Sequence, residues 1–200
     1  MTLEGGEGAG KSFQARALGR RLRELGVPYL LTYEPGATEL GLRLRELLMD
    51  VSLDLSPWTE LFLFAADRAQ HVQEVLRPAL AAGQVVLCER FSDSTIAYQG
   101  YGRGLPLEQV RQVCGAAADG LVPDLTFLLD VPPEVGLARK KGDDDRFRHQ
   151  ALDFHRRVRE GYLALAREDP RRIVVVDAAL PQQQVTDLLW EHLLGLLPSR

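Results

Sequence analysis

The 200-residue sequence has little cysteine, no excess of positive charge and no apolar stretch long enough to span a membrane. Its two cysteines, Cys88 and Cys114, have the spacing of neither a metal site nor a redox pair, and the four histidines lack metal-ligand spacing. The formal net charge of −4 argues against nucleic acid or a membrane surface as a partner. Because no signal peptide is evident, we expect a cytoplasmic protein.

Short apolar segments alternate with longer helical patterns, which is typical of a parallel sheet covered by helices. We expect strands at residues 1–4, 29–33, 84–88, 125–131 and 173–176. We expect helices at residues 11–25, 39–48, 57–82, 107–118, 134–140, 150–168 and 181–197. The sequence contains no linker or internal repeat, so it predicts a single α/β domain over residues 1–200 with three layers and a five-stranded parallel sheet.

Residues 5–12, Gly-Gly-Glu-Gly-Ala-Gly-Lys-Ser, match the phosphate-binding pattern G-x-x-x-x-G-K-[ST] of the P-loop NTPase fold. Glycines allow a tight turn whose backbone N–H groups point at a polyphosphate, and the helix that follows adds its positive dipole end. Lys11 would neutralise the β- and γ-phosphates, and the Ser12 hydroxyl could ligate Mg²⁺. A glycine-rich turn without a ligand is the alternative, and the position between an expected strand and an expected helix disfavours it.

A second pair of charges follows the expected strand at residues 84–88. Glu89 could hold Mg²⁺ through water at the carboxyl end of the sheet, and the fork of Arg90 suits a phosphate. The alternative is a surface ion pair of little energetic value. A GTPase would also carry Asn-Lys-x-Asp to recognise guanine, and the sequence has no such stretch.

Phe64 and Arg68 are four residues apart and therefore share a helix face. An aromatic ring beside a guanidinium could hold a flat base that has carbonyl acceptors. Spacing alone favours the alternative, in which Phe64 packs in the core and Arg68 is solvated.

The segment at residues 139–149 is rich in charge and poor in apolar side chains. Composition alone favours a solvated loop between helices. Its cations could instead close over phosphates as a short lid.

Several blocks in this order resemble the thymidylate kinase family, whose members transfer the ATP γ-phosphate to dTMP. Besides the phosphate loop they are Glu-Pro-Gly at residues 34–36, Phe-Ala-Ala-Asp-Arg-Ala-Gln at 64–70, Glu-Arg-Phe at 89–91 and Ser-Thr-Ile-Ala-Tyr-Gln at 94–99. The blocks at 64–70 and 94–99 are specific to the family. The resemblance implies a homodimeric kinase that uses ATP and Mg²⁺ and acts on dTMP.

The resemblance also implies a role for each matched residue. The ATP-binding residues would be Gly5, Gly6, Glu7, Gly8, Ala9, Gly10, Lys11, Ser12 and, beside adenine, Arg139. Phe64 would stack on thymine, Arg68 would donate to a thymine carbonyl, and Arg90 would bind the acceptor phosphate. The other residues expected around dTMP are Glu7 at the 3′-hydroxyl, Glu34, Thr95, Gln99, and Tyr98 against the 2′ position. Ser12 and Glu89 would serve the metal.

Some family members carry a catalytic arginine in the phosphate loop, at the position of Gly8, so this chain resembles the type whose lid supplies the cation. Arg146 or Lys141 is then expected to act in transfer, with Arg139 a further possibility. Lysines stand at 140 and 141 where arginines are typical of the family, and the first strand is short. These departures leave two alternatives open: a nucleotide-binding protein with impaired catalysis, and a kinase for another nucleoside monophosphate.

Overall fold

The computed structural model describes residues 1–139 and 146–197. Five parallel strands form one sheet in the order β2-β3-β1-β4-β5. The strands are β1 (Thr2–Glu4), β2 (Tyr29–Tyr33), β3 (Val85–Glu89), β4 (Thr126–Asp130) and β5 (Ile173–Asp177). Because β1 pairs with both β3 and β4, the loop that follows β1 lies at the centre of the sheet's carboxyl edge.

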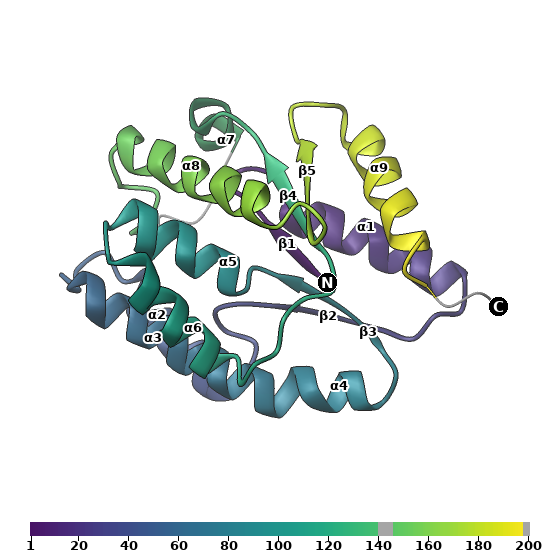
Figure 1. Cartoon of the computed structure of the whole chain (residues 1–200), viewed down its shortest axis with the longest axis horizontal. Helices are drawn as coiled ribbons and strands as arrows, with labels where there is room; N and C mark the ends of the chain where they lie inside the picture. The colour runs from purple at the N-terminus through teal and green to yellow at the C-terminus, as the bar shows by residue number, and fades with distance from the viewer. Residues whose placement is uncertain (140–145, 198–200) are drawn as a thin grey trace.

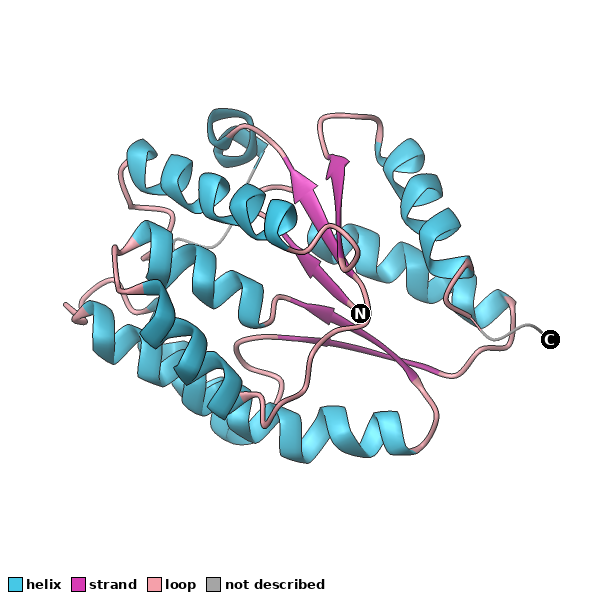
Figure 2. Cartoon of the chain, viewed as in Figure 1, coloured by secondary structure: helices cyan, strands magenta, loops and turns pink. Residues whose placement is uncertain are grey.

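Helices cover both faces of the sheet (Figures 1 and 2). One face is covered by α1 (Lys11–Glu24) and α9 (Gln182–Leu194). The other is covered by α3 (Pro57–His71), the π-helical turn η1 (Val72–Leu76), α4 (Arg77–Ala81), α5 (Ser92–Thr95), η2 (Ile96–Gly102), α6 (Leu107–Ala117) and α8 (Leu152–Glu168). Two further helices lie outside these layers: α2 (Glu39–Met49) packs on α3, and α7 (Pro133–Arg139) packs on α8. Within the described ranges, no helix has the length and apolar character needed to cross a membrane.

Alternation along the central strands builds two cores. Leu3, Leu87 and Phe127 are fully buried toward α1 and α9. Leu128, the neighbour of Phe127, belongs to the core on the opposite face, beneath α8 and η2. A sheet buried on both faces explains why the expected strands appear as short apolar segments in the sequence.

The expected layers and all five strands are confirmed, with ends shifted by a residue or so. The helix expected at 57–82 is present, with the π-helical turn η1 inside it. The helical segment at 92–102 was not predicted, because its serine, threonine and glycine residues have low helix propensity. Nearly all of η2 is buried, so its sequence also lacks the periodic polar positions that mark the solvent-facing side of an amphipathic helix.

Candidate active site

The phosphate loop turns between β1 and α1 with three glycines at positive φ: Gly5 (138°), Gly8 (66°) and Gly10 (93°). A Cβ atom on Gly8 would lie 1.9 Å from the carbonyl oxygen of Gly136 in α7. A Cβ on Gly136 would in turn lie 2.2 Å from the carbonyl oxygen of Glu7. The loop and α7 therefore meet backbone to backbone, and both positions need glycine.

Lys11 is buried at the mouth of this loop. Its Nζ donates to the carbonyl oxygens of Gly6 at 2.9 Å and Gly5 at 3.2 Å. Burial, and then the nearby charge of Arg90, lower the pKa of Lys11 to about 8. A polyanion bound in the loop would favour the charged ammonium again.

Ser12 and Glu89 come together from the start of α1 and the end of β3. The Ser12 hydroxyl donates to Glu89 Oε2 at 2.6 Å. A hydroxyl and one carboxylate are a donor set that suits Mg²⁺, which takes its remaining ligands from water and phosphate oxygens. Among residues 1–139 and 146–197 no group of three or more His, Cys, Asp or Glu side chains is placed to hold a metal ion.

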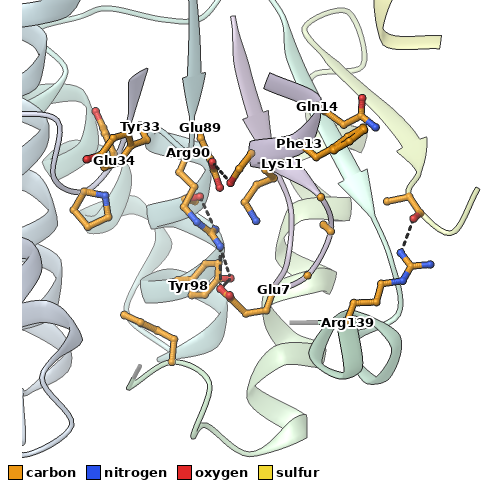
Figure 3. A pocket seen from close by; sticks show the side chains of 18 of the residues that line it. Glu7, Lys11, Phe13, Gln14, Tyr33, Glu34, Glu89, Arg90, Tyr98 and Arg139 are labelled. Carbon is orange, nitrogen blue, oxygen red and sulfur yellow. Dashed lines mark hydrogen bonds and ion pairs between the residues drawn. The ribbon is translucent and has the colours of Figure 1, made fainter. Parts of the chain in front are cut away.

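Arg90 connects the phosphate loop with the helical segment at 92–102 (Figure 3). Its Nη2 donates to Glu7 Oε1 at 2.9 Å and to the Tyr98 hydroxyl at 3.3 Å. The same Glu7 oxygen accepts from Tyr98 at 3.0 Å. The backbone of Arg90 has a φ of 68°, a left-handed conformation that is costly for a residue with a side chain and typical of functional sites.

Behind Arg90 lies Glu4, which sequence reasoning missed. Glu4 is fully buried and accepts from the Phe91 backbone N–H at 2.7 Å and from the Tyr162 hydroxyl at 3.0 Å. Burial, and then the charge of Asp93, raise the pKa of Glu4 to about 7. A carboxyl group directly before the phosphate loop was visible in the sequence, but its partners come from distant segments.

Arg68 is buried, at 2% exposure, so the alternative of a solvated Arg68 is wrong. Its Nε donates to Glu34 Oε2 at 2.9 Å, and its guanidinium lies 5.0 Å from the centre of the Phe91 ring. Glu34 Oε1 is also 2.9 Å from His71 Nδ1. Glu34 is therefore the buried counter-ion of Arg68 as well as a residue at the edge of the site.

These groups line one cavity of about 1090 Å³. From the phosphate loop come residues 7–12, and from the other side come Glu34, Phe64, Arg68, Thr95, Tyr98 and Gln99. Glu89, Arg90 and Arg139 also line it, whereas Gly5 and Gly6 do not. The two regions that the sequence assigns to separate nucleotides thus face a shared space.

The residues expected in the lid differ in whether they line the cavity. Arg139 lines the cavity and donates to the carbonyl oxygen of Ala178 at 2.7 Å. Arg146 instead forms an ion pair with Glu60 and is not among the lining residues. Phe147, the next residue, does line the cavity and packs edge-on against Tyr98. Lys141 lies outside the described residues.

Comparisons with known proteins identify the family of this chain. Residues 3–189 match the family model described as thymidylate kinase. A thymidylate kinase of Synechococcus sp. (strain JA-2-3B'a(2-13)) is 54% identical over 198 residues, which cover 99% of this chain and 95% of the relative. A thymidylate kinase of Deinococcus radiodurans is 48% identical, covering 95% of this chain and 93% of the relative. The crystal structure of thymidylate kinase from Ehrlichia chaffeensis superposes with a TM-score of 0.81 at 32% identity, covering 96% of each chain.

Proposed function

Because this chain belongs to the thymidylate kinase family and phosphorylates dTMP with ATP as co-substrate, we propose that its cavity holds both nucleotides at once. The supporting observation is that the phosphate loop and the pair Phe64 and Arg68 line the same space, with Arg90 between them. The donor phosphates would lie on the loop, and the acceptor base would lie against Phe64. The γ-phosphate would then be transferred from the side of Lys11 toward the acceptor phosphate at Arg90.

On the ATP side, the backbone N–H groups of the loop and the Lys11 ammonium would bind the β- and γ-phosphates. Ser12 and Glu89 would hold Mg²⁺, which when bound neutralises charge on the phosphate oxygens. Arg139, at the far side of the cavity, would pack against adenine.

On the dTMP side, the Arg90 guanidinium, which its hydrogen bonds to Glu7 and Tyr98 orient, would bind the acceptor phosphate. Glu7 would accept from the 3′-hydroxyl, and the Tyr98 ring would exclude a 2′-hydroxyl. Phe64 and Arg68 would hold the base, and Thr95 and Gln99 would close its pocket.

Phosphoryl transfer depends on positioning and charge neutralisation, which these residues supply without covalent help. The lid adds a further cation, for which Lys141 and Arg146 are the candidates. Arg146 would have to leave Glu60 to reach the phosphates, since the two are ion-paired here.

A coupled ADP-release assay with dTMP, dUMP, AMP and GMP, each with and without Mg²⁺, tests this assignment. We expect the highest kcat/KM with dTMP, and we expect no ADP release when Mg²⁺ is left out. Phe64→Ala should raise the KM for dTMP by about tenfold or more, because a stacked aromatic contributes about 1–3 kcal/mol per base, and should leave the KM for ATP unchanged. Faster turnover of AMP or GMP than of dTMP would contradict the base site.

We also propose a homodimer, as the family resemblance implies. Exposed apolar side chains lie on the two packed helices α2 and α3, among them Leu47 (46% exposed) and Phe62 (55%). Sedimentation equilibrium should give twice the chain mass, and Leu47→Asp with Phe62→Asp should give the single mass. Leu188→Asp, at an exposed position of α9, is the matched control and should stay dimeric. A single mass for the unchanged chain would refute the dimer.

The single-domain organisation and the cytoplasmic location stay predictions from the sequence.

A further inference from the structure

Glu60 is a fully buried carboxylate in α3, one turn before Phe64, and the proposed function gives it no role of its own. Its Oε1 accepts from Gln99 Nε2 at 2.7 Å and from Arg103 Nε at 3.1 Å. Its Oε2 accepts from Arg103 Nη2 at 2.9 Å and from Arg146. Two guanidinium groups therefore compensate the charge, and the third partner is a residue that lines the cavity.

This contact fixes which way the Gln99 side chain is turned. An ionised carboxylate can only accept hydrogen bonds, whereas a glutamine amide has a donor end and an acceptor end. Glu60 therefore binds the NH₂ group of Gln99. The Gln99 carbonyl oxygen has no hydrogen bond within the described part of the chain, so it is the free end of an amide that lines the cavity.

A fixed carbonyl oxygen in the cavity that Arg68 also lines would make a two-point pattern with that guanidinium. Arg68 offers a donor, because two of its nitrogens bind Glu34 and its Nη1 lies 3.9 Å from Cys114 Sγ, a weak partner. Thymine and uracil present the complement, a carbonyl at C4 and an N–H at N3. Cytosine presents the reverse, an amino group at C4 and an acceptor nitrogen at N3.

We propose that Glu60 is a specificity-determining positioning residue: it holds the Gln99 amide so that its oxygen accepts from N3–H of the base and rejects cytosine. The inference rests on the proposed placement of the base between Phe64 and Arg68. A buried amide that can turn over would lose this discrimination, because it could meet either base with a matching group.

The test compares kcat/KM for dTMP, dUMP and dCMP in the unchanged chain and in Glu60→Gln. A glutamine at position 60 can donate as well as accept, so Gln99 is free to turn its NH₂ group toward the base. We expect the dTMP-to-dCMP ratio to fall by about tenfold or more, the scale of one hydrogen bond made or left unsatisfied. The dTMP-to-dUMP ratio should stay within about twofold, since these bases share the N3 and C4 groups.

Arg103→Gln is the matched control. It removes a guanidinium from the same cluster but leaves the contact between Glu60 and Gln99, so the melting temperature should drop while the dTMP-to-dCMP ratio stays. If Glu60→Gln keeps the ratio, or if Arg103→Gln loses it equally, Glu60 has only a structural role and the inference is overturned.

Gln99→Met separates this inference from the proposed base site. If Gln99→Met lowers the ratio and Glu60→Gln does not, only the role of Glu60 fails. If Gln99→Met and Phe64→Ala both leave dTMP and dCMP kinetics unchanged, the base site itself is misplaced. Neutron diffraction of the unchanged chain with bound dTMP needs no variant. The deuterated amide group (ND₂) of Gln99 should face Glu60. If ND₂ faces the base instead, the inference is overturned.

Discussion

Replacement of Lys11 by alanine is expected to lower kcat with dTMP and ATP by about a thousandfold, the lower end of the range given for one cation at a transferring phosphoryl group. Among the described residues, 1–139 and 146–197, Lys11 is the only lysine that lines the cavity. Its ammonium donates to two loop carbonyls, which place it at the loop where the phosphates are proposed to bind. Single-turnover measurements of ADP formation would report the loss at the chemical step.

Binding of dTMP, measured by thermal stabilisation, should be unchanged in the Lys11→Ala protein, because Lys11 is not part of the base site that we propose. A loss of kcat below about tenfold would show that other groups neutralise the charge on the phosphates.

The pH profile is an independent check of the role of Lys11. A lysine loses its proton as pH rises, so with a pKa of about 8 in the free protein kcat/KM for ATP should fall above about pH 8. Lys11→Ala should lack that limb.

Replacement of Arg68 by methionine is expected to lower the free energy of unfolding by about 3–5 kcal/mol, as found when one partner of a buried ion pair is removed. The variant leaves Glu34 buried, with His71 as its remaining partner. Asp67 adds to the cost, because burial and then the charge of Glu34 already raise the pKa of Asp67 to about 6. Urea unfolding at pH 7 would measure the loss.

The double variant Arg68→Met with Glu34→Gln is the control. It removes both charges and should recover much of the lost stability, although both proteins should bind dTMP weakly. If the single and double variants are equally unstable, the packing of Arg68 on Phe91 matters more than the ion pair.

The features that the sequence predicted correctly are those encoded locally. The phosphate loop is eight consecutive residues, and each strand is a short segment rich in apolar residues, so both are visible without knowledge of the neighbouring segments. Helical spacing places Phe64 and Arg68 on one face of α3, and both line the cavity. Their contact with a base stays a prediction.

What could not be predicted depends on contacts between distant segments. Arg68 has a counter-ion 34 residues earlier, and Glu4 has a partner in Tyr162, 158 residues later. No spacing in the sequence indicates that Glu60 holds Gln99, since the contact exists only because η2 packs beside α3. The packing of η2 against its neighbours, chiefly α8, supports a helical conformation at 96–102 despite the low propensity of these residues.

The close approach of Gly8 and Gly136 limits how this enzyme could evolve. An arginine at position 8, the arrangement found in some relatives, would drive its first side-chain carbon into the main chain of α7. Changing Gly136 at the same time would not help, because the obstacle is its carbonyl group. The chain could adopt that arrangement only by moving the whole helix away, together with the Arg139 that ends it. An arginine at position 8 would therefore require a backbone rearrangement in addition to the change of the codon.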